Sequence, residues 1–121
     1  DLIGGRIKEK EIGLPFGKIV TREIKEEIGT KARYRINEAP VAIGRHYYYS
    51  KSQQKVQYIF WVFFEALYQG GSIQISSEHS QYEWIKVNKQ NLKKYFVKGS
   101  LEGMQHYLTK KFAENSVPKN H

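Results

Sequence analysis

The sequence predicts an α/β fold, and three observations support this class. A stretch at 14–28 and another at 101–112 place apolar residues at helical spacing. Between them, the stretch 56–64 is aromatic and β-branched on both faces, as in a strand covered on both sides. A central strand of this kind needs a helix on each face of its sheet, and the two amphipathic helices supply them.

The size and composition fit one domain. A chain of 121 residues with 40% hydrophobic residues can fill a single core, so we expect one domain over 1–121, with about 115–121 as a flexible tail. No apolar run is long enough to span a membrane. The absence of cysteine excludes disulfides and thiolate metal sites, and it makes the cytoplasm the default location.

The charge points to an anionic partner. A formal net charge of +8 suits a nucleotide, a nucleic acid or a membrane surface. The basic residues are scattered rather than grouped, so we do not expect a dedicated polybasic tail, and a solvated basic surface is the other interpretation.

The chain opens with a short predicted strand and a turn at Gly4 and Gly5, followed by a charged loop. The first helix then begins at Leu14 and Pro15, because proline suits the first helical position. Gly29 supplies its C-terminal end. The residues expected to face the core recur every four positions: Phe16, Val20, Ile24 and Ile28.

Several short strands follow the first helix. Their predicted ranges are 34–36, 41–43, 46–49, 56–64, 73–75 and 82–87, separated by polar or glycine- and proline-containing turns. Gly44 is read as the break between the second and third of these strands. The last helix is expected from Leu101 to about Phe112, with Ser100 as its N-cap.

Three carboxylates share one side of the first helix. Glu23, Glu26 and Glu27 are three or four residues apart, so they fall within an arc of about 100° beside the apolar stripe. Like charges this close favour a counter-charge, which Arg22 can supply to Glu26. Their oxygens also suit a hard cation such as Mg²⁺ or Mn²⁺. An ordinary solvated helix face is the other interpretation.

A longer pattern surrounds these carboxylates. Gly5, five further residues and Glu11 precede the block Arg-Glu-Ile-Lys-Glu-Glu-Ile-Gly at 22–29. This string resembles the Nudix box, G-x5-E-x7-R-E-U-x-E-E-x-G-U, where U is aliphatic. It departs at Thr30, and ten residues separate Glu11 from Arg22 where the family has seven. The segment 77–85 also looks like the family's loop glutamate, here Glu78, before a late strand that ends in tryptophan.

The resemblance implies a fold and an activity. The fold would be a Nudix-type α/β/α sandwich around a mixed sheet, N-terminally truncated because the strands before the box are absent. The activity would be a Mg²⁺-dependent hydrolysis, with Mn²⁺ as a substitute, of the pyrophosphate bond in a nucleoside diphosphate linked to another moiety.

The resemblance also assigns roles in this sequence. Glu26 and Glu27 would be the main metal ligands, joined by Glu23, as a ligand or to polarise the attacking water, and by the Gly5 carbonyl. Two further residues complete the predicted catalytic set: Arg22 would orient a carboxylate, and Glu78 would be the base or an extra ligand.

For the substrate, Arg6 and Arg45 could meet phosphate and Tyr47 could stack on a base. We expect a small nucleotide-type substrate and no membrane, with nucleic acid and a homodimer left open. Two alternatives remain at this stage. One is a non-catalytic nucleotide-binding regulatory module, and the other is an RNA 5′-end pyrophosphohydrolase, which the positive charge favours.

Overall fold

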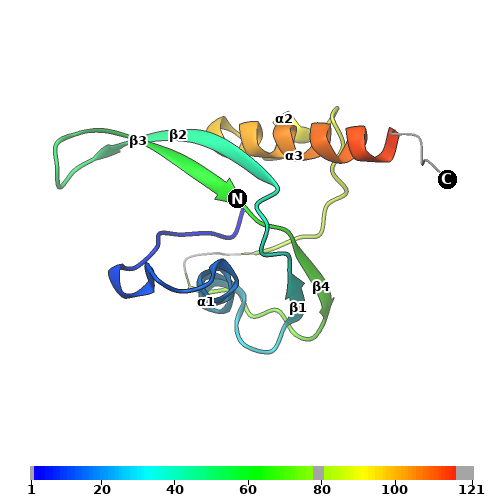
Figure 1. Cartoon of the computed structure of the whole chain (residues 1–121), viewed down its shortest axis with the longest axis horizontal. Coiled ribbons are helices and arrows are strands. Elements are labelled where there is room, and N and C mark those ends of the chain that lie inside the picture. Colours follow the sequence, from blue (N-terminus) through cyan, green and yellow to red (C-terminus); the bar gives the residue numbers. More distant parts are fainter. Residues whose placement is uncertain (1, 78–80, 117–121) are drawn as a thin grey trace. The chain divides into compact units, whose positions relative to one another are not determined.

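A computed structural model describes residues 2–77 and 81–116 (Figure 1). The chain divides into two compact units. The α1 unit contains residues 2–40 and 64–85, and the hairpin unit contains 41–63 and the chain from 86 onward. Each unit is described by itself below, and the single domain expected from the sequence stays a prediction.

In the α1 unit, the first helix forms where the sequence predicts it. The helix α1 runs over Phe16–Ile28, directly after Pro15, and ends at Gly29, whose φ of 84° suits a residue without a Cβ. Ile24 is buried as expected, but Phe16 is 54% exposed. Ile19 is buried in its place, so the core-facing stripe is rotated from the predicted one. A short 3-10 helix, η1, precedes α1 at Glu9–Glu11.

Two strands of the α1 unit pair antiparallel. They are β1, Arg33–Ile36, and β4, Ala66–Gly70, with Tyr34 opposite Tyr68. The prediction at 34–36 is therefore confirmed. The strand β4 was not predicted as a separate element, since the apolar run containing it continues from the preceding strand.

Three other strand predictions are wrong. The segment 73–75 forms no strand, because the backbone in and next to it forms hydrogen bonds with carbonyls at the C-terminal end of α1 instead. The amide of Gln74 donates to the carbonyl of Ile28 at 2.9 Å, and the amide of Ser76 donates to that of Glu27 at 3.0 Å. These carbonyls lack partners within the helix, so an irregular segment satisfies them. The segment 82–87, which passes from this unit into the hairpin unit, is likewise irregular, as are residues 2 and 3, where an opening strand was expected before the turn at Gly4 and Gly5.

The hairpin unit consists of two long strands and two helices. The strand β2, Ala42–Ser50, pairs antiparallel with β3, Lys55–Phe63, so that Gly44 lies opposite Trp61. Gly44 does not break β2, contrary to the prediction of two strands at 41–43 and 46–49. A Cβ at this position would overlap the Gly99 carbonyl oxygen of the last helix. The glycine is therefore needed for close packing of helix on strand.

The last helix begins earlier than predicted. The helix α3 runs over Lys98–Ser116 and lies alongside β2 (Figure 1). Ser100 is not its N-cap, because its hydroxyl lies inside the helix and donates to the Val97 carbonyl at 2.8 Å. A short helix not predicted from the sequence, α2 at Leu92–Tyr95, precedes it. Its Leu92, only 2% exposed, forms the core of this unit with Ala42 and Phe96.

The expected cover on both faces of β3 is absent from the part of the chain that the structure describes. The odd-numbered residues 57–63 are half-buried, and the even-numbered residues 56–62 are exposed. The described strands form two antiparallel pairs with no mixed sheet. A mixture of helices and strands agrees with the α/β class, and the Nudix-type sandwich stays a prediction. No helix among the described residues is long and apolar enough to cross a membrane.

Candidate functional site

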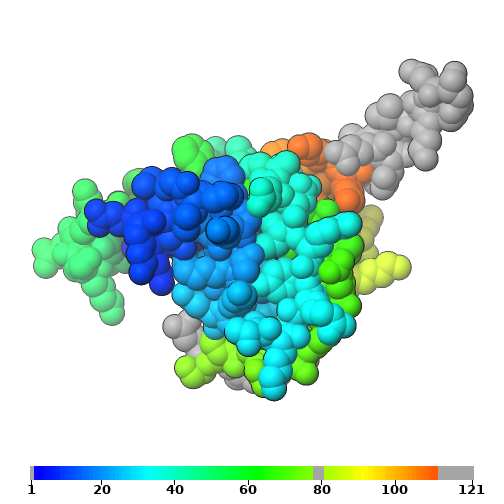
Figure 2. Space-filling model, turned by 60° about the horizontal axis from the view of Figure 1, so that its bottom comes forward, coloured from blue at the N-terminus to red at the C-terminus, as the bar shows by residue number. Residues whose placement is uncertain are grey.

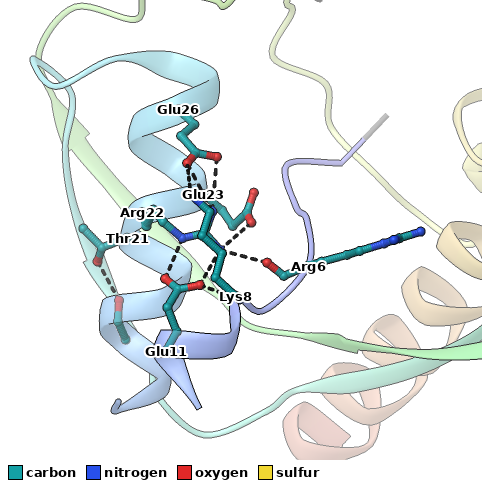
Figure 3. Close-up of polar contacts among 8 residues, drawn as sticks. Arg6, Lys8, Glu11, Thr21, Arg22, Glu23 and Glu26 are labelled. Carbon is teal, nitrogen blue, oxygen red and sulfur yellow. Dashed lines mark hydrogen bonds and ion pairs between the residues drawn. The ribbon is translucent and has the colours of Figure 1, made fainter. Parts of the chain in front are cut away.

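Arg22 lies at the centre of a cluster of carboxylates on the α1 unit, which we call the Arg22 cluster (Figure 3). Its Nε donates to Glu11 Oε2 at 2.6 Å, and its Nη2 donates to Glu11 Oε1 at 2.9 Å. The same Nη2 lies 2.8 Å from Glu23 Oε1, and Nη1 lies 3.2 Å from both oxygens of Glu26. One guanidinium thus contacts three carboxylates from η1 and α1.

Glu11 is the most buried member of the Arg22 cluster. The residue is only 5% exposed, although it is ionisable. Its Oε1 also accepts a hydrogen bond from the backbone N–H of Lys8 at 2.8 Å, which ties the carboxylate to the start of η1. The hydrogen bond from Arg22 holds the pKa of the Glu11 carboxyl below its usual value, against the opposing effect of burial. Glu11 is therefore held as a carboxylate.

The glycine segment before η1 lies against the acidic side of α1. The N–H of Gly4 donates to Glu27 Oε1 at 3.2 Å. A Cβ at Gly5 would overlap the Glu23 carboxylate, whose position Arg22 fixes, so the close approach of backbone to carboxylate requires a glycine. Figure 2 shows this N-terminal segment, in dark blue, beside the lighter blue surface of α1. Gly5 thus lies against Glu23 and Gly4 against Glu27, and metal binding by these residues stays a prediction.

Glu26 is the most accessible carboxylate in the Arg22 cluster. Its side chain is 50% exposed, and Lys8 Nζ lies 3.5 Å from its Oε1. The hydrogen bonds from Arg22 lower the pKa of its carboxyl. Arg22 and Glu26 also border a groove of about 890 Å³ between α1 and β1, which is further lined by Lys18, Lys25 and Arg35 among others. Of the three carboxylates expected to line a groove, only Glu26 borders this one, whose lining also includes Glu38 and carries more basic than acidic residues.

The carboxylates of the Arg22 cluster have the chemistry that a hard cation needs. Anionic oxygens from α1 and a nearby backbone carbonyl at Gly5 match the preferences of Mg²⁺. Within 2–77 and 81–116, however, no three carboxylate or imidazole groups are arranged to hold a metal ion. The reason is local, since Glu23 and Glu26 turn toward Arg22 and Glu27 turns toward Gly4.

The other predicted residues lie elsewhere. Arg6 contributes its backbone carbonyl, which accepts from Arg22 Nη2 at 2.9 Å, while its side chain points away from Arg22 in Figure 3. Arg45 and Tyr47 belong to the hairpin unit. There Arg45 forms an ion pair with Glu102 at 2.6 Å. Glu78 lies outside the described residues.

In the hairpin unit, Lys98 Nζ lies 4.8 Å from the centre of the Tyr47 ring. A phosphate contact by Arg45 and base stacking by Tyr47 stay predictions.

From the sequence, Lys8 could meet phosphate, but its two contacts in the Arg22 cluster were not foreseen: its backbone N–H donates to Glu11, and its ammonium pairs with Glu26. A signal for the first contact exists, because a glutamate three residues after a helix start often bonds back to that start. The contact between the Lys8 ammonium and Glu26 has no such sequence signal, since it depends on how the loop before η1 returns to α1.

No family model, no curated protein and no solved structure matches this chain. Its candidate function therefore follows from the Arg22 cluster itself. The resemblance to the Nudix box adds an expectation to this geometry, and membership of that superfamily stays a prediction.

Proposed function

We propose that this chain hydrolyses the pyrophosphate bond of a nucleoside diphosphate linked to another moiety, with Mg²⁺ or Mn²⁺ as cofactor. The observation that carries the proposal is the gathering of Glu11, Glu23 and Glu26 around Arg22, with Gly5 against Glu23. Carboxylates from η1 and α1 meet at one guanidinium, and this contact supports the proposal. A solvated helix face would not require a buried glutamate or a glycine at the point of contact.

Glu23, Glu26, Glu27 and the Gly5 carbonyl would hold the cation. A bound Mg²⁺ neutralises a diphosphate and lowers the pKa of the attacking water. Arg22 retains Glu11 and Glu23 as fixed carboxylates, with side chains only 7% and 12% exposed. Glu26 is half exposed and makes its contacts to Arg22 at 3.2 Å, so its carboxylate can exchange the guanidinium for a cation at the smallest cost.

The surroundings of the Arg22 cluster suit an anionic substrate. Lys18, Lys25 and Arg35 line the groove that Glu26 borders, and ammonium and guanidinium groups attract phosphate oxygens. The formal net charge of +8 adds a longer-range attraction for the same ligands. We therefore expect the phosphates to enter along this groove, toward Glu26.

Product release tests the proposal directly. The full chain is incubated with Mg²⁺ or Mn²⁺ and a panel of nucleoside triphosphates, nucleotide sugars, dinucleoside polyphosphates and dinucleotide cofactors. We expect turnover of at least one class, reduced roughly 100-fold or more by Glu26→Gln or Glu27→Gln. Glu9→Gln removes an equal charge from exposed η1 and should leave the rate unchanged. Glu78→Gln tests the predicted base.

Absence of turnover across the panel contradicts the proposal. So does an unchanged rate in both Glu26→Gln and Glu27→Gln.

A second candidate is a module that binds a nucleotide without hydrolysing it. The contacts of Arg22 favour it, because the chain already neutralises Glu11, Glu23 and Glu26 without a metal. Calorimetry separates the two functions. Binding that persists in Glu26→Gln without added metal and without turnover supports the module, and binding that requires Mg²⁺ and Glu26 supports the hydrolase.

A further inference from the structure

The two edges of the β2–β3 hairpin differ in their protection. On the β2 edge, α3 supplies acceptors for the backbone: Ile43 N–H donates to His106 Nδ1 at 3.1 Å, and Arg45 N–H donates to Glu102 Oε1 at 2.6 Å. Figure 1 shows α3 running along this side of the hairpin. Strand edges left open pair readily with other chains, and β2 is closed to such pairing by these side chains.

The register shows which backbone groups of β3 remain open. The N–H groups of Ile43 and Arg45 point away from β3, so the even-numbered residues of β2 are those that bond across the hairpin. These residues lie opposite odd-numbered residues of β3, such as Gly44 opposite Trp61 and His46 opposite Ile59. The N–H and C=O groups of the even-numbered residues of β3 therefore point to its outer edge. Among the described residues, no other strand pairs with that edge.

The same residues of β3 expose their side chains. Tyr58 is 79% exposed and Phe60 is 76% exposed, while Val56 and Val62 are about half exposed. An aromatic side chain offers roughly 150–250 Å² of surface, so these four residues present on the order of 500 Å² per chain. Pairing at the strand edge covers the flanks of these side chains and leaves the outer face of the sheet open, so this area is an upper limit for what a second strand covers.

We propose that β3 pairs antiparallel with β3 of a second copy of this chain, about a two-fold axis at Ile59. Around Ile59 the exposed residues are matched: Tyr58 meets Phe60 of the second copy, and Val56 meets its Val62. These pairs use the open backbone groups, so every N–H and C=O on the outer edges from Val56 to Val62 gains a partner. The hairpins join into a four-stranded sheet without free inner edges. Isologous contacts of this type close at two copies.

Charge does not oppose the pairing. Lys55 is the only charged residue in β3, and the two-fold axis sends the two copies of it to opposite ends of the shared edge. Eight steps of about 3.3 Å separate them by roughly 26 Å, well beyond the Debye length of about 8 Å at physiological salt. Within the paired segment, aromatic residues face aromatic residues and valine faces valine, which are favourable cross-strand pairs.

Cross-linking tests the register, because the natural chain has no cysteine. The variant Ile59→Cys places its two thiols on the axis, where facing Cα atoms are about 4.5 Å apart, within the range for a disulfide. We expect a disulfide-linked dimer under mild oxidation. Tyr49→Cys lies on the exposed face of β2, outside the proposed interface, and serves as the matched control that stays unlinked. If Ile59→Cys fails to fold, the double variant Tyr58→Cys/Phe60→Cys replaces it. In this variant the thiol at position 58 of one copy faces the thiol at position 60 of the second copy, and the same disulfide-linked dimer is expected.

Sedimentation of the full chain from about 1 µM to about 100 µM tests the association itself. We expect a monomer–dimer equilibrium in this range, and a dissociation constant raised at least tenfold by Phe60→Lys, because an exposed ammonium would face Tyr58 of the second copy. Tyr49→Lys should leave the constant unchanged. The double variant Tyr58→Glu/Phe60→Lys pairs opposite charges across the axis and should restore dimerisation.

A chain that stays monomeric at about 100 µM overturns the proposal. Equal cross-linking of Ile59→Cys and Tyr49→Cys also overturns it. These tests of dimerisation do not depend on whether the Arg22 cluster catalyses hydrolysis.

Discussion

Arg22 donates two parallel hydrogen bonds to the Glu11 carboxylate, from Nε to Oε2 at 2.6 Å and from Nη2 to Oε1 at 2.9 Å. This bidentate pairing joins η1 to α1. Ten residues separate Glu11 from Arg22 in the sequence, and the last six of them already belong to α1.

Replacing Arg22 by lysine should destabilise the protein and lower its Tm by several degrees. Lysine keeps the positive charge but lacks the planar fork that bonds both oxygens of Glu11. Glu11, only 5% exposed, would then keep a poorly partnered carboxylate in a site with little access to water. Thermal denaturation followed by circular dichroism measures the shift. A Tm equal to that of the unmodified chain would show that charge alone is sufficient.

Magnesium should stabilise the chain if the Arg22 cluster holds the ion. A ligand that binds only the folded state at 100 times its dissociation constant adds about 2.7 kcal/mol to the free energy of unfolding. Thermal melts with and without Mg²⁺, at matched ionic strength, measure the effect. Glu27→Gln should reduce the increase in Tm, and Glu9→Gln should not. An increase that is identical in all three proteins would place the cation elsewhere.

Acid should weaken the contact between Arg45 and Glu102. The hydrogen bonds from Arg45 lower the pKa of the Glu102 carboxyl below its ordinary value of 4.5. A lowered folded-state pKa gives stability that is fully present above 4.5 and is lost as the pH falls through the lowered value. Urea denaturation at several pH values should show Glu102→Gln less stable than the natural chain at pH 7, and this difference should shrink below pH 4.5. A difference independent of pH would rule out ionisation as its cause.

Substituting alanine at two glycines should have opposite effects. Gly44→Ala forces a Cβ toward the Gly99 carbonyl oxygen and should cost roughly 1–3 kcal/mol of unfolding free energy. Gly13→Ala is the control, since a Cβ there meets nothing within 4 Å. It should be neutral or stabilising by less than about 1 kcal/mol, through the loss of chain entropy in the unfolded state. Chemical denaturation of both variants checks the contrast, and a tolerated Gly44→Ala would indicate that α3 can shift away from β2.

The position of α1 could be predicted because its signals are local. Pro15 and Gly29 mark its two ends through backbone conformations that they favour wherever they occur. The stretch 73–75 could not be read in the same way, although its residues suit a strand. Amides in and next to this stretch donate to carbonyls at the end of α1, and a local sequence pattern cannot predict hydrogen-bond partners so distant in the sequence.

The Arg22 cluster shows a similar division. The shared face of Glu23 and Glu26 and the pairing of Arg22 with Glu26 follow from helical geometry, so the sequence predicts them. The burial of Glu11 and the role of Lys8 were not predicted, because both depend on the path of the chain between residues 4 and 15.

The sequence by itself determined the helix that carries the acidic residues, the α/β class and the polar character of the candidate site. These follow from helical and strand periodicity and from side-chain chemistry within a few neighbouring positions. Only the tertiary structure decided that Gly5 lies against Glu23, that Glu11 is buried on Arg22, and that the outer face of β3 is exposed. Each of these depends on which segments distant in the sequence come into contact, and a local pattern of residues does not determine such tertiary contacts.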